Sequence, residues 1–264
     1  MTVVLISGPG VSGEPPVYTI WGPATPSSAG SSRTFSLAEL EALGTEEVGS
    51  PYFDRAMNYR GSRFRVISFS RLVDRFDPAG TGNAVLLNCF DDYQGILTVA
   101  DIRRYRLRLA TRIKLRPGYK KPGWLNPLLV IVPEGSRAPF QERFMTANIR
   151  ELRFVDLEEY YAPLRKIGTS SPQVREGMEA FKNNCLFCHS LNGVGGNKGI
   201  RLPGTYDFSR SAAWERFQKD FAAFHHKDHP NKQNVDQFVS DEELRAIVQF
   251  LGRLAETRSS PPHD

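Results

Sequence analysis

The chain has 264 residues, of which 40% are hydrophobic and 24% are charged, the ordinary composition of a soluble globular protein with room for two domains. No apolar run approaches the length needed to cross a bilayer, so we expect no membrane span. The net charge of +5 is dispersed along the chain, which argues against nucleic-acid binding and is compatible with an acidic protein partner.

The first part of the chain, residues 1–162, alternates short β-branched or aromatic runs with turn residues, which predicts an α+β domain. Ser36 followed by Glu39 is a capping box that starts a short helix, and Arg71–Phe76 indicates another. The Arg residues that alternate over Arg103–Arg108 indicate the solvated face of a strand, with a docking face as the alternative. The expected strands are Val3–Ser7, Val17–Trp21, Arg63–Phe69, Ala84–Asn88, Leu128–Val132 and Ile149–Leu157.

The pattern changes after residue 162. Residues 163–171 are polar and rich in turn formers, which predicts a linker. Residues 172–258 then show helical periodicity and form the predicted second domain, an all-α one. Ser171 can cap a helix that has Pro172 in its first turn and that runs up to Cys185.

Two further helices are expected in this second domain. Ser240 and Glu243 form a capping box that opens the last one. The helix before it carries aromatic residues at spacings of three, four and three, and the last helix carries apolar residues on one face. These residues are Trp214, Phe217, Phe221 and Phe224 in the earlier of the two helices, and Leu244, Ile247, Val248 and Leu251 in the last.

The most informative motif is Cys185-Leu186-Phe187-Cys188-His189. Cys-x-x-Cys-His is the attachment signature of a c-type haem. Both thiols can bond to one porphyrin edge from a single turn, and the next residue places an imidazole under the iron. We therefore predict one covalently bound haem c, held by Cys185 and Cys188 with His189 as the proximal iron ligand.

Zinc binding and a redox disulfide are the alternatives for a Cys-x-x-Cys pair. A zinc site would need a second pair of ligands, and Cys89 is the only other cysteine in the chain. A thioredoxin-type motif would follow a buried strand, whereas the residues before Cys185 are helical in pattern. Both alternatives are therefore weaker than haem attachment.

Residues 172–256 resemble a class I cytochrome c over the whole segment. The resemblance implies that the first and last helices cross, with Gly177 and Phe181 meeting Phe250 and Leu251. A Gly-rich stretch, residues 192–199, resembles the loop that follows the haem motif in this family. The family then has Gly-Pro where this chain has Gly199-Ile200, and we expect the Ile200 carbonyl to orient His189.

The family's distal iron ligand is a methionine between that loop and the closing helix, and this chain has none there. The corresponding stretch holds His225, His226 and His229. His229 precedes Pro230 as the family's methionine precedes a proline, so we predict His229 as the distal ligand. His225 and His226 are the alternatives, and Asn234 is a weaker candidate. An iron with an open distal site is the remaining possibility.

The first domain resembles the molybdopterin-binding domain of the sulfite oxidase family over about 130 residues. The similarity lies in the order and spacing of short motifs, which are Phe35–Leu43, Asn58–Gly61 with Ile67–Leu72, Asp91–Leu97 with Val99–Ile102, and Asn126–Pro133. The family ligates molybdenum through a cysteine upstream of, or beside, the tyrosine-x-Gly segment. This chain has no cysteine before Cys89, which we interpret as a buried structural thiol.

We therefore expect the first domain to lack molybdopterin and to serve partner docking. The predicted function is electron transfer to or from a redox partner protein, and catalysis is less favoured. Two alternatives stay open: a molybdopterin-dependent oxidoreductase with a fused cytochrome that uses Cys89, and a haem-based sensor or peroxidase with an open distal site.

Attachment of this kind of haem takes place outside the bacterial cytoplasm, which predicts a periplasmic location. The first eight residues are too short and uncharged for a secretory signal. We accordingly expect that a native signal peptide has been removed or replaced.

Overall fold

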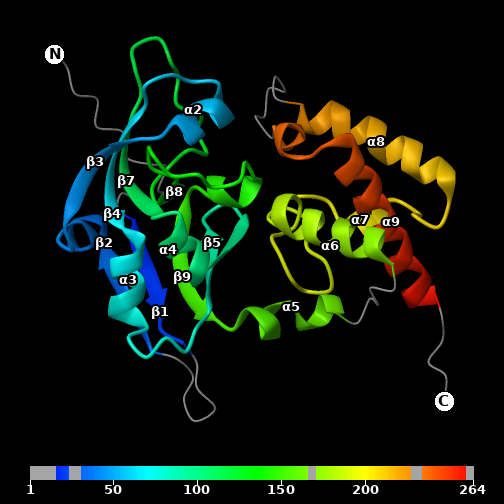
Figure 1. Cartoon of the computed structure of the whole chain (residues 1–264), viewed down its shortest axis with the longest axis horizontal. Coiled ribbons are helices and arrows are strands. Elements are labelled where there is room, and N and C mark those ends of the chain that lie inside the picture. The colour runs from blue at the N-terminus through cyan, green and yellow to red at the C-terminus, as the bar shows by residue number, and fades with distance from the viewer. Residues whose placement is uncertain (1–15, 24–30, 166–170, 227–233, 260–264) are drawn as a thin grey trace. The chain divides into compact units, whose positions relative to one another are not determined.

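A computed structural model describes residues 16–23, 31–165, 171–226 and 234–259. The chain divides into two compact units (Figure 1). The first contains described residues up to Asp91, together with Ile96–Pro139 and Phe144–Leu157. The second contains Asp92–Gly95, Phe140–Arg143 and the described residues from Glu158 onward. No helix in the described ranges is long and apolar enough to cross a membrane.

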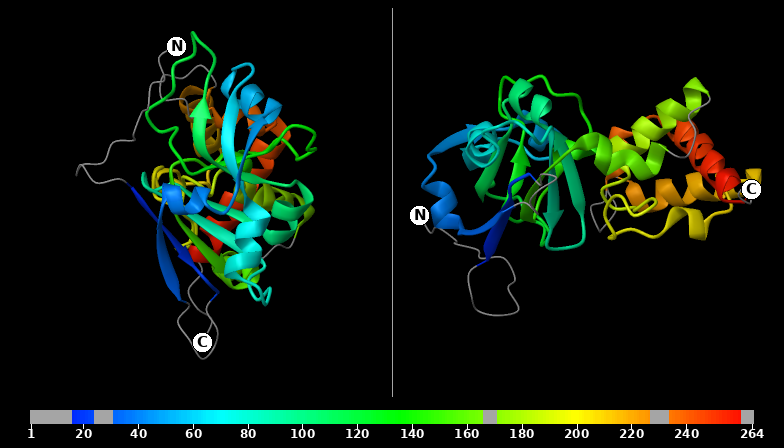
Figure 2. Two further views of the ribbon diagram at one scale, coloured as in Figure 1. Left: turned by 90° about the vertical axis from the view of Figure 1, so that its left-hand side faces the viewer. Right: turned by 90° about the horizontal axis from the view of Figure 1, so that it is seen from below.

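The first unit contains a mixed sheet of five strands in the order β2-β1-β9-β5-β6. Strand β1 is antiparallel to β2 and parallel to β9, and β9 is antiparallel to β5. The pair β1 and β2 lies at one edge of this sheet, drawn in blue in Figure 2. The strands are β1 (Val17–Trp21), β2 (Ser32–Ser36), β5 (Ala84–Cys89), β6 (Gln94–Thr98) and β9 (Ile149–Val155).

A second sheet of this unit has four antiparallel strands in the order β3-β4-β7-β8. Four short helices begin at side-chain caps, including the predicted capping box in which Ser36 and Glu39 bond each other's backbone. The strands are β3 (Thr45–Gly49), β4 (Arg63–Ser68), β7 (Arg108–Lys114) and β8 (Leu129–Ile131), and the helices are α1 (Leu37–Glu41), α2 (Pro51–Met57), α3 (Phe69–Phe76) and α4 (Val99–Arg104).

Two sheets with short helices agree with the predicted α+β class, and five of the six expected strands are present, β1 with the predicted bounds and the other four with shifted ends. The sixth, Val3–Ser7, lies outside the described residues. The strand expected over Arg103–Arg108 is wrong. Thr98 caps α4 through the Asp101 amide, the helix runs to Arg104, and Arg106 has φ of 50°, so β7 begins only at Arg108.

From Glu158 onward, the described residues of the second unit are helical apart from an isolated bridge between Leu191 and Val194, while its segment Asp92–Gly95 contains the start of β6. Its core is one cluster of buried apolar residues that includes Phe181, Phe217 and Phe250. The helices are α5 (Leu157–Arg165), α6 (Pro172–Asn184), α7 (Leu202–Thr205), α8 (Ser211–His225) and α9 (Asp241–Ser259), with the 3-10 turns η1 (Glu142–Met145) and η2 (Val235–Phe238). Helix α5 begins and η1 ends in the first unit.

Helices α6 and α9 cross closely, as the sequence predicts (Figure 1). The rings of Phe181 and Phe250 lie 5.8 Å apart between centroids, and both are buried. Gly177 faces the backbone of Ala246, where a Cβ atom would have no room. The crossing fixes the end of α6, which leads into the Cys-x-x-Cys-His motif.

Helix α5 continues through Pro163 to Arg165, so the first three residues of the predicted linker, 163–165, are helical. Leu164 is buried in the helical core, and Tyr160 and Tyr161 pack against it. Burial of these side chains stabilises the last turn of α5 despite the proline. The predicted start of the next helix is confirmed, since Ser171 caps α6 through the Val174 amide.

Candidate functional site

The Cys-x-x-Cys-His motif forms a tight turn directly after α6. The amides of Cys185 and Leu186 both donate to the Phe181 carbonyl, at 2.8 and 3.0 Å, and the second of these bonds departs from the α-helical pattern at the end of α6. The Cys185 carbonyl then accepts from the amides of Cys188 at 3.2 Å and His189 at 3.0 Å. These hydrogen bonds bring both thiols and the imidazole to the same cavity.

His189 is held in one orientation by the backbone. Its Nδ1 lies 2.7 Å from the carbonyl oxygen of Ile200, as expected from the sequence. A carbonyl can only accept, so Nδ1 donates and Nε2 keeps its lone pair for a metal. Burial lowers the pKa of His189 below its ordinary value, against a smaller opposing effect of the Ile200 bond, and this favours the neutral ligand form.

Gly199 makes room for the His189 ring. A Cβ atom at Gly199 would lie 2.5 Å from Cε1 and 2.6 Å from Nδ1 of His189. The Gly199 amide also donates to the Cys188 carbonyl at 2.8 Å, and this bond holds the end of the loop against the motif. The residue before Ile200 must therefore be small for the imidazole to keep its position.

The cavity has a volume of about 300 Å³. Its walls are mainly apolar, and Phe217 and Phe221 of α8 are among the residues that line it. The lining residues are Glu142, Asn184, Cys185, Cys188, His189, Lys198, Gly199, Ile200, Leu202, Tyr206, Phe217, Asp220, Phe221, Phe224, His225 and Val235. Two thiols, one oriented imidazole and apolar walls are the donor set and surroundings that a covalently bound haem needs.

The structure separates the candidate distal ligands. His225 is the last residue of α8 and lines the cavity, with its ring centroid 6.1 Å from that of His189. His226 is exposed and is not among the lining residues. Asn234 is also not among them. The predicted ligand His229 lies outside the described residues, so its role stays a prediction.

Two polar groups on the cavity wall were not predicted from the sequence. Glu142 belongs to a separate stretch of this unit, and its amide donates to the Asn184 side chain at 3.2 Å. The Tyr93 hydroxyl donates to the Glu142 carboxylate at 2.8 Å. Burial raises the pKa of Glu142 to about 7, against smaller opposing effects of Tyr93 and Lys198. Glu142 precedes the motif by more than 40 positions, and no sequence signal links the two.

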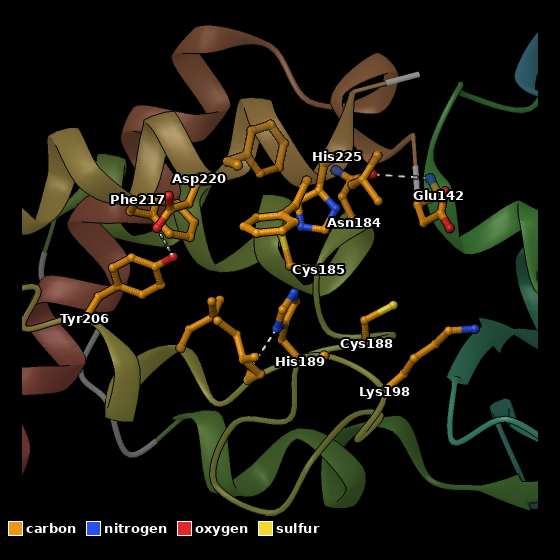
Figure 3. Close-up of a pocket in the computed structure, with 16 residues that line it drawn as sticks. Glu142, Asn184, Cys185, Cys188, His189, Lys198, Tyr206, Phe217, Asp220 and His225 are labelled. Atoms are coloured by element: carbon orange, nitrogen blue, oxygen red, sulfur yellow. Dashed lines mark hydrogen bonds between the residues drawn. The ribbon is translucent and has the colours of Figure 1, made fainter. Parts of the chain in front are cut away.

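The second polar feature is the pair Tyr206 and Asp220, which connects the end of α7 to α8 by a hydrogen bond. The hydroxyl of Tyr206 donates to the carboxylate of Asp220 at 2.8 Å, and Arg216 lies 3.6 Å from the same carboxylate. Tyr206 and Asp220 both line the cavity (Figure 3). The spacing of aromatic residues in α8 predicts its apolar face, but it gives no indication of this pair.

Cys89 lies far from this chemistry in the sequence and belongs to the first unit. It ends strand β5 and is 2% exposed, with its sulfur 3.9 Å from the carbonyl oxygen of Leu87. This distance is close to the upper limit for a hydrogen bond donated by sulfur. This position agrees with the interpretation of Cys89 as a structural thiol.

Comparison with known proteins gives one finding for the second unit. Residues 174–255 match the family model described as cytochrome c. The match begins in α6 and ends in α9, so it includes the motif turn, the loop and α8. No curated protein is matched by the chain.

Proposed function

Since residues 174–255 are a cytochrome c domain, we propose that the chain carries electrons through one haem c bound in the cavity described above. The family assignment makes electron transfer through covalently bound haem the general function of this domain. The single haem and the residues that hold it belong to the proposal. When bound, the haem supplies an iron centre that accepts or gives up one electron.

One observation carries this proposal: Cys185, Cys188 and His189 line one cavity, and His189 donates to Ile200. The two thiols hold the group covalently. His189 binds the iron through Nε2, and the Ile200 carbonyl keeps the ring from turning. Phe217 and Phe221 line the same cavity and would place apolar side chains beside the group.

For the first unit we propose a sulfite oxidase-like domain that docks a redox partner without molybdopterin. The mixed sheet and short helices support an α+β domain, and Cys89 is almost completely buried. A cysteine that ligates molybdenum must present its sulfur to the cofactor pocket, which burial in β5 opposes. We further propose that the protein works in the periplasm, where this type of haem is attached.

Haem and metal analysis tests the proposal. Protein produced with a haem-attachment system should hold one haem per chain that survives denaturation, and the double variant Cys185→Ser/Cys188→Ser should hold none. Cys89→Ser is the matched control and should keep its haem. Stoichiometric molybdenum in the purified protein would contradict the docking role of the first unit and favour the oxidoreductase alternative.

A potentiometric titration tests electron transfer itself. A single reversible one-electron wave without turnover of peroxide supports the carrier. Peroxide turnover, or slow reduction coupled to ligand binding, would instead favour the sensor or peroxidase alternative.

A further inference from the structure

The geometry points to His225 as the second axial ligand of the haem iron, opposite His189. This inference rests on the proposed haem site and deepens it by naming the residue on the distal side. The sequence favours His229 within the histidine-containing stretch because a proline follows it, and gives His225 as an alternative. The observation behind it is the placement of two imidazoles in one cavity.

The separation of the two rings fits one iron between them. The ring centroids of His189 and His225 lie 6.1 Å apart, and the ring planes are at 88°. A metal ion lies about 2 Å from an imidazole nitrogen, with the ring centre about 1 Å further on, so two imidazoles on opposite sides of one iron have centres about 6 Å apart. Figure 3 shows the two imidazoles on opposite sides of the cavity that both residues line.

The geometry of helix α8 favours His225 over His226 as the distal ligand. Phe217, Phe221 and His225 follow one another at intervals of four, so they lie on one face of α8, and all three line the cavity. The ring of Phe221 packs 5.1 Å from that of His225, between centroids. His226 has extended backbone with ψ of 139°, which ends the helix, and its side chain is exposed.

No methionine of the described ranges competes for this position. Met57 and Met145 belong to the first unit. Met178 packs against the helical core from α6, before the motif. None of these three sulfurs is among the atoms of the cavity wall. Outside the motif, His225 is therefore the one imidazole, and no sulfur is present, among the described residues that line the cavity.

A second imidazole has a measurable consequence. Imidazole donates more strongly to ferric iron than a thioether does, so a bis-histidine site has a lower reduction potential than a histidine–methionine site. A filled distal position also prevents carbon monoxide from binding to the ferrous iron.

The test compares His225→Ala with the matched variants His226→Ala and His229→Ala in the full haem-loaded chain. We expect the unaltered protein to be low-spin in electron paramagnetic resonance and inert to carbon monoxide. His225→Ala should become high-spin and take up one carbon monoxide per haem. His226→Ala and His229→Ala should behave like the unaltered protein.

The inference is overturned if the unaltered protein is already high-spin, or if His229→Ala rather than His225→Ala changes the spin state. If His225→Ala does not yield folded protein, His225→Met decides the question. A sulfur-to-iron charge-transfer band and a raised potential are expected, and their absence overturns the assignment. Haem content is measured on every variant. If the unaltered chain holds no covalent haem, the proposed function is refuted, and the assignment of His225 is not what fails.

Discussion

Gly177 of α6 packs against the backbone of Ala246 in α9 so closely that a Cβ atom at residue 177 would overlap the Ala246 carbonyl. The atom that would have to move is backbone, so a flexible side chain cannot relieve the overlap. The two helices pack Phe181 against Phe250 beside this contact, and α6 leads directly into the haem motif. The separation of the helices therefore controls both the stability of the domain and the position of its site.

Gly177→Ala should lower the free energy of unfolding of the second unit by about 3 kcal/mol, because overpacking at a backbone contact forces the helices apart. Denaturant unfolding of the haem-loaded protein, followed at the haem absorption, measures the loss. Gly204→Ala is the control, since a Cβ atom there meets only Arg201 Cβ, at 4.0 Å. Equal stability of the two variants would show that α6 and α9 do not pack this closely.

Gly199→Ala should displace the ring of His189, because the new Cβ atom would lie 2.5 Å from Cε1. We expect weaker proximal ligation, seen as a partial change of the ferric spectrum towards high spin while covalent haem is retained. Gly204→Ala again serves as the control. An unchanged spectrum would mean that the imidazole is not held against residue 199.

Glu142 should make the reduction potential depend on pH. Burial raises the pKa of Glu142 to about 7, and an ionised carboxylate on the cavity wall favours the ferric iron. The potential should therefore fall as the pH rises through about 7, and Glu142→Gln should flatten this dependence. Potentiometric titrations at several pH values measure it, with the exposed residue Glu242 changed to Gln as the control.

The same group affects stability with a definite sign. Its folded pKa is about 7 and its ordinary value is 4.5, so between these values the folded state binds more protons than the unfolded state. The contribution of Glu142 is fully present below pH 4.5 and is lost as the pH rises through about 7. In Glu142→Gln, the unfolding free energy of the haem-loaded protein should decrease less as the pH rises, because the contribution of Glu142 is absent. A slope that persists in the variant would assign the effect to another group.

Ser240→Ala should cost about 1 kcal/mol of unfolding free energy, because it removes one half of a capping box. The Ser240 hydroxyl accepts from the Glu243 amide at 3.2 Å, and the Glu243 carboxylate accepts from the Ser240 amide at 2.8 Å. Chemical denaturation measures the change, with the exposed mid-helix residue Gln249 changed to Ala as the control. A loss in the control as large as in Ser240→Ala would argue against the cap.

Local chemistry explains which elements were predictable. The capping boxes at Ser36 and Ser240 and the Ser171-Pro172 start of α6 rest on contacts within four residues, and the structure contains all of them. Strand β1 was predicted with its exact bounds from alternating apolar residues. Helix α2 is not among the predicted helices, although Ser50 and Pro51 form the same Ser-Pro helix start as Ser171 and Pro172.

The site was predictable only in part. The motif residues Cys185, Cys188 and His189 are local, and the bond from His189 to Ile200 followed from the family resemblance. The distal side depends on where α8 ends, and a helix end cannot be read from the sequence to one residue. Glu142 reaches the cavity through long-range packing, which no pattern of spacing records.

The loop after the motif is closed at both ends. The Gly199 amide bonds the Cys188 carbonyl and His189 bonds Ile200, while inside the loop Leu191 and Val194 exchange hydrogen bonds of 2.8 and 3.0 Å. Its tip, Asn192-Gly193, has left-handed backbone, and both residues are exposed. Residues inserted at this tip would disturb the bond from the Asn192 side chain to the Pro163 carbonyl and would otherwise add loop-closure entropy, which grows slowly with length, so we expect the imidazole to stay in place in a longer loop.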